Sequence, residues 1–118
     1  SFIATNCDLK CPVSYGKFIP DCGAICKLIE TATGEKPTFL GKPNSYMINF
    51  AMKKWNLNKS DIVTVGDRLY TDIAIGVNNG VDSIAVLTGE TTEAEIAKSS
   101  IKPTYIYNSI RDLCNEII

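Results

Sequence analysis

The 118-residue sequence contains no histidine, no excess of charge of one sign and no long apolar run. Its 12 basic and 13 acidic residues give a formal net charge of −1, so no basic surface indicates a nucleic-acid partner. No apolar stretch approaches the ~20 residues that span a bilayer, and no basic leader followed by an apolar segment marks a signal peptide. We therefore expect a cytoplasmic protein with neither nucleic acid nor a membrane as partner.

The lack of histidine also bears on the five cysteines, which are Cys7, Cys11, Cys22, Cys26 and Cys114. An odd number fits poorly with a closed disulfide framework. The first four form two pairs with the same spacing, which raises zinc as an alternative. Zinc sites usually use the tighter Cys-x-x-Cys pair, often together with histidine. The pattern favours free, reduced thiols.

Short apolar runs alternate with helical patterns along the chain. The segment from Cys11 to Pro20 is expected to be a loop, because Pro12, Gly16 and Pro20 interrupt it. Strands separated by helices of ~10 residues predict an α/β fold with a parallel sheet and right-handed crossovers. The expected strands lie at residues 2–5, 38–40, 62–65, 83–87 and 104–107.

Four segments that follow these strands place apolar residues on one face of a helix. Gly34 and Gly80 are expected to end two of them as C-terminal caps. A capping box from Thr92 to Glu95 predicts the start of a further short helix. The expected buried faces are Ala24, Ile25, Leu28, Ile29 and Ala32; Met47, Phe50, Ala51 and Trp55; Ile73, Gly76 and Val77; and Ile110, Leu113, Cys114 and Ile117.

The expected strand at 62–65 leads directly into Gly66-Asp67, and Asp72 follows five residues later as a new helix begins. Ligands of parallel α/β sheets bind at the carboxyl ends of the strands. A carboxylate placed there suits Mg²⁺, which takes one or two protein carboxylates and keeps several waters. The alternative is that Asp67 is a turn residue and Asp72 an ordinary acid at a helix N-terminus.

Lys42, in Gly41-Lys42-Pro43, is expected to follow an earlier strand and so to lie at the same edge of the sheet. Its amine would neutralise a phosphoryl group there; the alternative is a solvated turn lysine. Two other classes fit less well. In a phosphoacceptor receiver domain the carboxylates should precede the lysine, and a nucleotide-cofactor domain should show G-x-G-x-x-G after a strand.

Several segments, taken together and in order, resemble the C-terminal part of a haloacid dehalogenase (HAD) superfamily phosphatase. They are residues 2–8, 32–37, 41–43, 66–73 and 86–91. The resemblance is to the subgroup of NagD-like and p-nitrophenylphosphatase-like enzymes. It implies a partial HAD-like, Rossmann-like parallel sheet with flanking helices, in which residues 1–118 form the C-terminal portion of the hydrolase core domain.

The resemblance also implies roles for individual residues. Lys42 would be a catalytic and substrate-binding residue that steadies the phosphate and the nucleophile, and Asp67 would bind the cofactor Mg²⁺. Asp72 would support catalysis through hydrogen bonds or through the water shell of the metal. Asn6 and Asp8 lie where the chain returns from the family's cap; Asn6 is a candidate substrate contact, although Asn-x-Asp is also good turn chemistry.

The family's nucleophile, an aspartate in an Asp-x-Asp motif that forms an aspartyl-phosphate, is absent from this sequence. We therefore expect a fragment of a Mg²⁺-dependent phosphomonoester phosphatase, inactive alone, that begins at Ser1 through an internal cut and lacks the cap. The alternative is a non-catalytic binding or regulatory module. Arg68 and Tyr70 are expected to be exposed.

The same absence affects the edge of the sheet. In the family the nucleophile strand lies beside the strand that carries the metal-binding acid. Without it, the strand at 62–65 would have an apolar, unpaired edge. We expect this edge to associate with another copy or with the missing N-terminal part, and the substrate to be a small phosphorylated metabolite.

Overall fold

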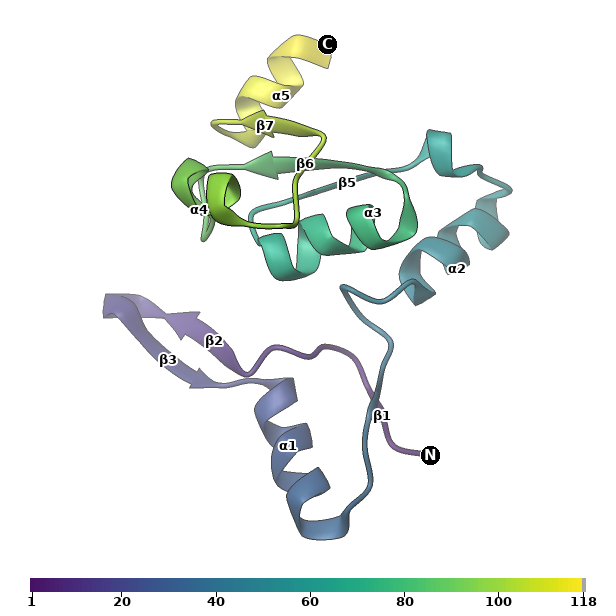
Figure 1. Ribbon diagram of the computed structural model, residues 1–118, viewed down its shortest axis with the longest axis vertical. Coiled ribbons are helices and arrows are strands. Elements are labelled where there is room, and N and C mark those ends of the chain that lie inside the picture. The colour runs from purple at the N-terminus through teal and green to yellow at the C-terminus, as the bar shows by residue number, and fades with distance from the viewer. Residues whose placement is uncertain (118) are drawn as a thin grey trace.

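The computed structural model describes residues 1–117, which alternate strands with helices as the sequence predicts (Figure 1). The elements in chain order are β1 (Ile3–Ala4), β2 (Lys10–Val13), η1 (Ser14–Gly16), β3 (Lys17–Pro20), α1 (Cys22–Thr33), β4 (Thr38–Phe39), α2 (Tyr46–Trp55), η2 (Lys59–Asp61), β5 (Val63–Gly66), η3 (Leu69–Ile73), α3 (Ala74–Asn79), β6 (Asp82–Val86), α4 (Glu93–Lys98), β7 (Tyr105–Tyr107) and α5 (Ile110–Ile117).

Strands β5, β6 and β7 form a parallel sheet in that order, which confirms the α/β class. The register pairs Gly66 with Ala85, and Ala85 with Ile106. In Figure 1, α3 and α5 lie on opposite sides of this sheet. The parallel strands are nevertheless divided between two sheets, because β1 pairs with β4 and β5 has β6 as its neighbour on one side only.

The loop prediction for residues 11–20 was wrong. Strands β2 and β3 form an antiparallel hairpin in which Pro12 pairs with Phe18 and Lys10 with Pro20. Each strand is an edge of a two-stranded ribbon, so a proline that donates no hydrogen bond is tolerated there. The turn uses Tyr15 and Gly16, both at positive φ (62° and 66°).

The predicted helix ends are confirmed. Gly34 and Gly80 adopt left-handed conformations directly after α1 and α3. The Thr92 hydroxyl accepts from the Glu95 backbone N–H, and the Glu95 carboxylate accepts from the Thr92 N–H in return. These local signals are carried by residues within four positions of each other, which is why the sequence predicts them well.

The buried core has two clusters around α3 and β6. Their buried members are Ile48, Ile75 and Val81 in one cluster, and Ile73, Ala85 and Ile96 in the other. The core position on α2 is therefore Ile48, and the predicted face was wrong, since Met47, Phe50 and Trp55 are more than half exposed.

The prediction for α5 was correct only at Leu113, which is buried, while Ile110, Cys114 and Ile117 are exposed. On α3, Gly76 is buried as predicted but Val77 is not. Within residues 1–117, none of the helices has the length and apolar character needed to cross a bilayer.

Candidate functional site

The three candidate residues lie in two connections, one after β4 and one between β5 and α3. Lys42 lies in the bend that follows β4, Asp67 comes directly after the last residue of β5, and Asp72 lies in the π-helical turn η3. This turn continues into α3, so the backbone reverses direction at the strand end within a few residues. Such tight strand-to-helix turns bring side chains of separate segments together.

Lys42 and Asp72 form an ion pair between Nζ and Oδ1. Asp72 is only 8% exposed, and its second oxygen, Oδ2, accepts from the Arg68 backbone N–H at 3.2 Å. Gly66 makes this position available, because a Cβ there would overlap the Asp72 side chain. Asp72 is thus a buried carboxylate whose charge is balanced by Lys42.

Asp67 is held by the loop between β6 and α4. Its Oδ2 accepts from the Glu90 N–H at 2.8 Å, and its backbone carbonyl accepts from the Thr91 N–H at 3.0 Å. Gly89 packs so closely that a Cβ at that position would overlap the Asp67 carboxylate. Two consecutive N–H groups and a glycine therefore fix the direction in which Asp67 points.

Arg68 was expected to be exposed, and this prediction was wrong. Its side chain is 22% exposed and makes two ion pairs, Nη1 to Asp8 Oδ2 at 3.0 Å and Nε to Glu90 Oε2 at 2.6 Å. Partial burial lowers the pKa of the guanidinium, but the charges of Tyr70, Glu90 and Asp8 outweigh this and raise the pKa above its ordinary value. Tyr70 is exposed, as expected.

Asn6 acts as a turn residue. Its Oδ1 accepts from the Asp8 N–H at 2.8 Å, and its Nδ2 donates to Asp21 Oδ1 at 3.4 Å. The neighbouring Cys7 thiol donates to the Lys42 carbonyl, so the turn lies against the bend that carries Lys42. Among residues 1–117, Asn6 has no hydrogen bond with Lys42, Asp67 or Asp72.

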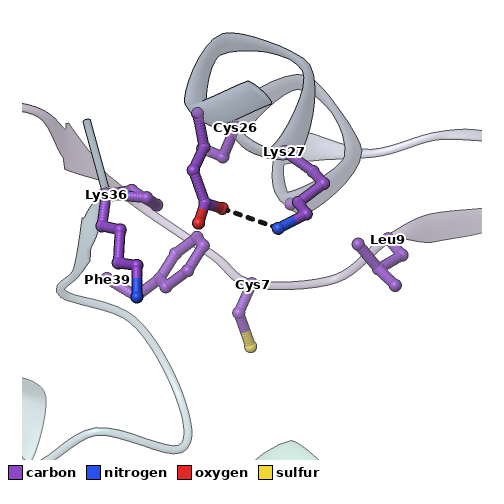
Figure 2. A pocket seen from close by; sticks show the side chains of 9 residues that line it. Cys7, Leu9, Cys26, Lys27, Lys36 and Phe39 are labelled. Carbon is purple, nitrogen blue, oxygen red and sulfur yellow. Dashed lines mark hydrogen bonds and ion pairs between the residues drawn. The ribbon is translucent and has the colours of Figure 1, made fainter. Parts of the chain in front are cut away.

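One cavity of the structure includes two of the three candidate residues, Lys42 and Asp72. This cavity, of about 320 Å³, is also bordered by Thr64 and Val65 of β5. Figure 2 shows another, of about 390 Å³, where Lys27 forms an ion pair with Glu30 beside Cys26 and Phe39. That cavity contains none of the three candidate residues, so its position does not fit the predicted chemistry.

The residues at the strand ends fit a Mg²⁺ ion. Oxygen donors from one or two carboxylates suffice when waters and phosphate oxygens complete the shell. Asp67 offers a carboxylate whose Oδ2 is already fixed by an N–H group. The Asp72 carboxylate is instead paired with the Lys42 amine. In the part of the chain from residue 1 to 117, no three side chains of His, Cys, Asp or Glu cluster as a metal cage, and all five cysteines are free thiols.

The family model for HAD-like hydrolases matches residues 39–113, well over half of the chain. The chain belongs to this family. The match covers Lys42, Asp67 and Asp72 and confirms the resemblance inferred from the sequence motifs.

Curated relatives are similar over nearly the whole chain. An acid sugar phosphatase of Staphylococcus saprophyticus is 40% identical over 98% of this chain and 44% of its own length. The ribonucleotide monophosphatase NagD of Escherichia coli is 38% identical over 95% of this chain and 43% of its own length. The chain thus spans less than half the length of the curated relatives it matches.

Solved structures show the same fold. A 4-nitrophenylphosphatase from Thermotoga maritima superimposes with a TM-score of 0.86 at 40% identity, over 96% of this chain and 43% of that one. A glycerol phosphate phosphatase from Mycobacterium tuberculosis, solved in complex with magnesium, gives 0.84 at 32% identity, over 95% and 34%. Both are phosphatases with an arrangement of strands and helices similar to this chain's.

Sequence reasoning missed the part that Arg68 and Glu90 play. Two signals were available. Arg68 directly follows Asp67, and Glu90 lies within the Val86–Thr91 motif; the resemblance includes both segments. Their pairing was not visible, because the two residues lie in loops that follow neighbouring strands, and only the register of β5 on β6 brings these loops together.

Proposed function

We propose that the protein to which this chain belongs is a Mg²⁺-dependent phosphomonoester phosphatase that acts through an aspartyl-phosphate. The observation that carries the proposal is the Lys42–Asp72 ion pair beside Asp67 at the end of β5. A fixed cation next to a fixed carboxylate provides what phosphoryl transfer requires, namely positioning and charge stabilisation. The phosphatase relatives support the same reaction class.

In this proposal Lys42 binds substrate and neutralises charge on the transferred phosphoryl oxygens. Asp72 positions the Lys42 amine, since its buried carboxylate holds Nζ at the strand end. Asp67 would hold Mg²⁺, which supplies charge stabilisation to the phosphoryl group. The attacking aspartate is not in this chain, because no Asp-x-Asp occurs in it.

The remaining expectations stay proposals. Residues 1–118 are proposed to be the C-terminal portion of the hydrolase core domain, and the substrate a small phosphorylated metabolite. Asn6 is proposed as a substrate contact through the turn it forms beside Lys42. The cytoplasmic location, the association with another copy or with the N-terminal part, and the lack of nucleic-acid and membrane partners remain predictions.

Hydrolysis of p-nitrophenyl phosphate by the full-length parent protein tests the reaction. We expect Mg²⁺-dependent turnover that Asp67→Asn lowers by 10²-fold or more (order of magnitude), because a carboxamide is a poor ligand for Mg²⁺. Asp82→Asn is the matched control, since Asp82 begins β6 at the opposite end of the sheet and pairs with Val63. It should retain turnover.

The alternative, a non-catalytic binding or regulatory module, makes a different prediction for the same protein. It should bind Mg²⁺ in calorimetry without releasing phosphate from any ester tested. A fully active Asp67→Asn variant would refute the metal role of Asp67. Phosphate release by the 118-residue chain alone would contradict the assignment of the nucleophile to a segment outside it.

A further inference from the structure

Arg68 connects three segments that are far apart in the sequence. Its guanidinium pairs with Asp8 of the turn after β1 and with Glu90 of the loop after β6, while its backbone N–H donates to Asp72. The Asp8 side chain is 13% exposed, so it is a largely buried acid. Five N–H donors in a planar fork allow one arginine to serve two carboxylates at once.

The pair with Glu90 bears directly on Asp67. The carboxylate of Glu90 is held by Arg68 Nε, and the backbone N–H of the same residue donates to Asp67 Oδ2. Arg68 is itself the residue that follows Asp67. These contacts form a closed ring. The peptide bond joins Asp67 to Arg68, the Arg68 side chain binds the Glu90 carboxylate, and the Glu90 N–H binds the Asp67 carboxylate.

The pair with Asp8 anchors this ring to the rest of the molecule. Asp8 Oδ1 is buried and accepts no hydrogen bond from any of residues 1–117. Arg68 is the cation that the structure pairs with this carboxylate. A buried charge is tolerated only when it is paired, so the ion pair holds the Asp8 turn against the strand end.

We propose that Arg68 is a positioning residue that fixes the Asp67 carboxylate through Glu90 and couples it to the Asp8 turn. The proposal rests on the proposed function, in which Asp67 holds Mg²⁺. Residues that orient a metal ligand typically change metal affinity or activity by about 10- to 100-fold when they are replaced.

Residue-resolved hydrogen exchange of the full-length parent protein, without metal, tests the ring itself. Glu90→Gln removes the charged partner but keeps the backbone N–H, and Glu90 is exposed enough (45%) for the variant to fold. We expect the amide of residue 90 to exchange about tenfold faster, because residue 90 is then held less firmly against its acceptor, the Asp67 carboxylate. Arg68→Lys, which offers one point charge in place of a fork, should give a smaller increase.

Arg111→Ala is the matched control, because Arg111 is the only other arginine and is exposed on α5. It should leave the exchange of residue 90 unchanged. Arg68→Ala alone is a weaker test, because it leaves the largely buried Asp8 carboxylate without its cation and so destabilises the fold. Combining Asp8→Asn with Arg68→Ala removes this destabilisation. Unchanged exchange at residue 90 in both Glu90→Gln and Arg68→Lys would overturn the proposal.

A second readout connects the ring to the metal. The Mg²⁺ concentration for half-maximal hydrolysis of p-nitrophenyl phosphate should rise by about 10- to 100-fold in Glu90→Gln, with KM at saturating Mg²⁺ little changed. A rise in KM with an unchanged Mg²⁺ requirement would overturn the proposal. If the wild-type parent hydrolyses no phosphate ester, the proposed function fails, and the exchange at residue 90 still decides whether Arg68 positions Asp67.

Discussion

At the scale of single residues, Gly66 and Gly89 leave the space that the carboxylates of Asp72 and Asp67 occupy. A Cβ on Gly66 would overlap the Asp72 side chain, which is paired with Lys42. We expect Gly66→Ala to lower the free energy of unfolding by about 1–3 kcal/mol, as overpacking does. It should also displace Asp72 and so lower phosphatase turnover per folded molecule in the full-length parent. Thermal unfolding and p-nitrophenyl phosphate hydrolysis measure the two effects.

The control for this substitution is another glycine that is sensitive to a side chain but distant from the site. Gly34 ends α1 at φ 79°, with open space where a Cβ would be. Gly34→Ala should cost about 1 kcal/mol through backbone strain alone, and turnover per folded molecule should stay at the wild-type level. Equal losses of turnover in the two variants would show that Gly66 acts through stability and not through Asp72.

At the scale of elements, the sequence predicts best those features that neighbouring residues determine. The ends of α1 and α3 and the capping box of α4 depend on contacts within one turn, and all were predicted. The face of α2 was not, because Met47 and Ile48 are both apolar and only the packing against Ile75 and Val81 selects Ile48. The β2–β3 hairpin was missed because its prolines suggest a loop.

The capping box of α4 should make stability depend on pH. Hydrogen bonds from the Thr92 backbone and side chain lower the pKa of Glu95 from its ordinary 4.5. The charged carboxylate therefore stabilises the fold fully above pH 4.5, and this contribution is lost as the pH falls through the lowered pKa. Urea denaturation should show wild type more stable than Glu95→Gln at pH 7, with the difference shrinking below pH 4.5. A constant difference across this range would contradict it.

At the scale of the whole molecule, the sequence predicted which residues gather but not how they pair. The strand pattern was enough to place Lys42 and Asp67 at carboxyl ends of strands, and Asp72 at the start of the helix that follows. It did not show that Lys42 would pair with Asp72, because that contact depends on how η3 turns back toward the bend after β4. The Arg68–Asp8 pair was equally hidden, since its partners lie sixty residues apart.

The open edge of β5 leads to a prediction about assembly. Its one strand neighbour among residues 1–117 is β6, and Val63 and Val65 are 50% and 40% exposed. An exposed apolar edge strand favours pairing with another chain.

We therefore expect the isolated 12.9 kDa chain to self-associate in sedimentation. Val63→Lys should shift it toward the monomer, because charge on an edge strand opposes pairing. Ile110→Lys, at similar exposure (54%) but on helix α5 and so not on a strand edge, is the matched control and should leave the association intact. A wild-type chain that sediments as a monomer at all concentrations would show that this edge is not a pairing surface.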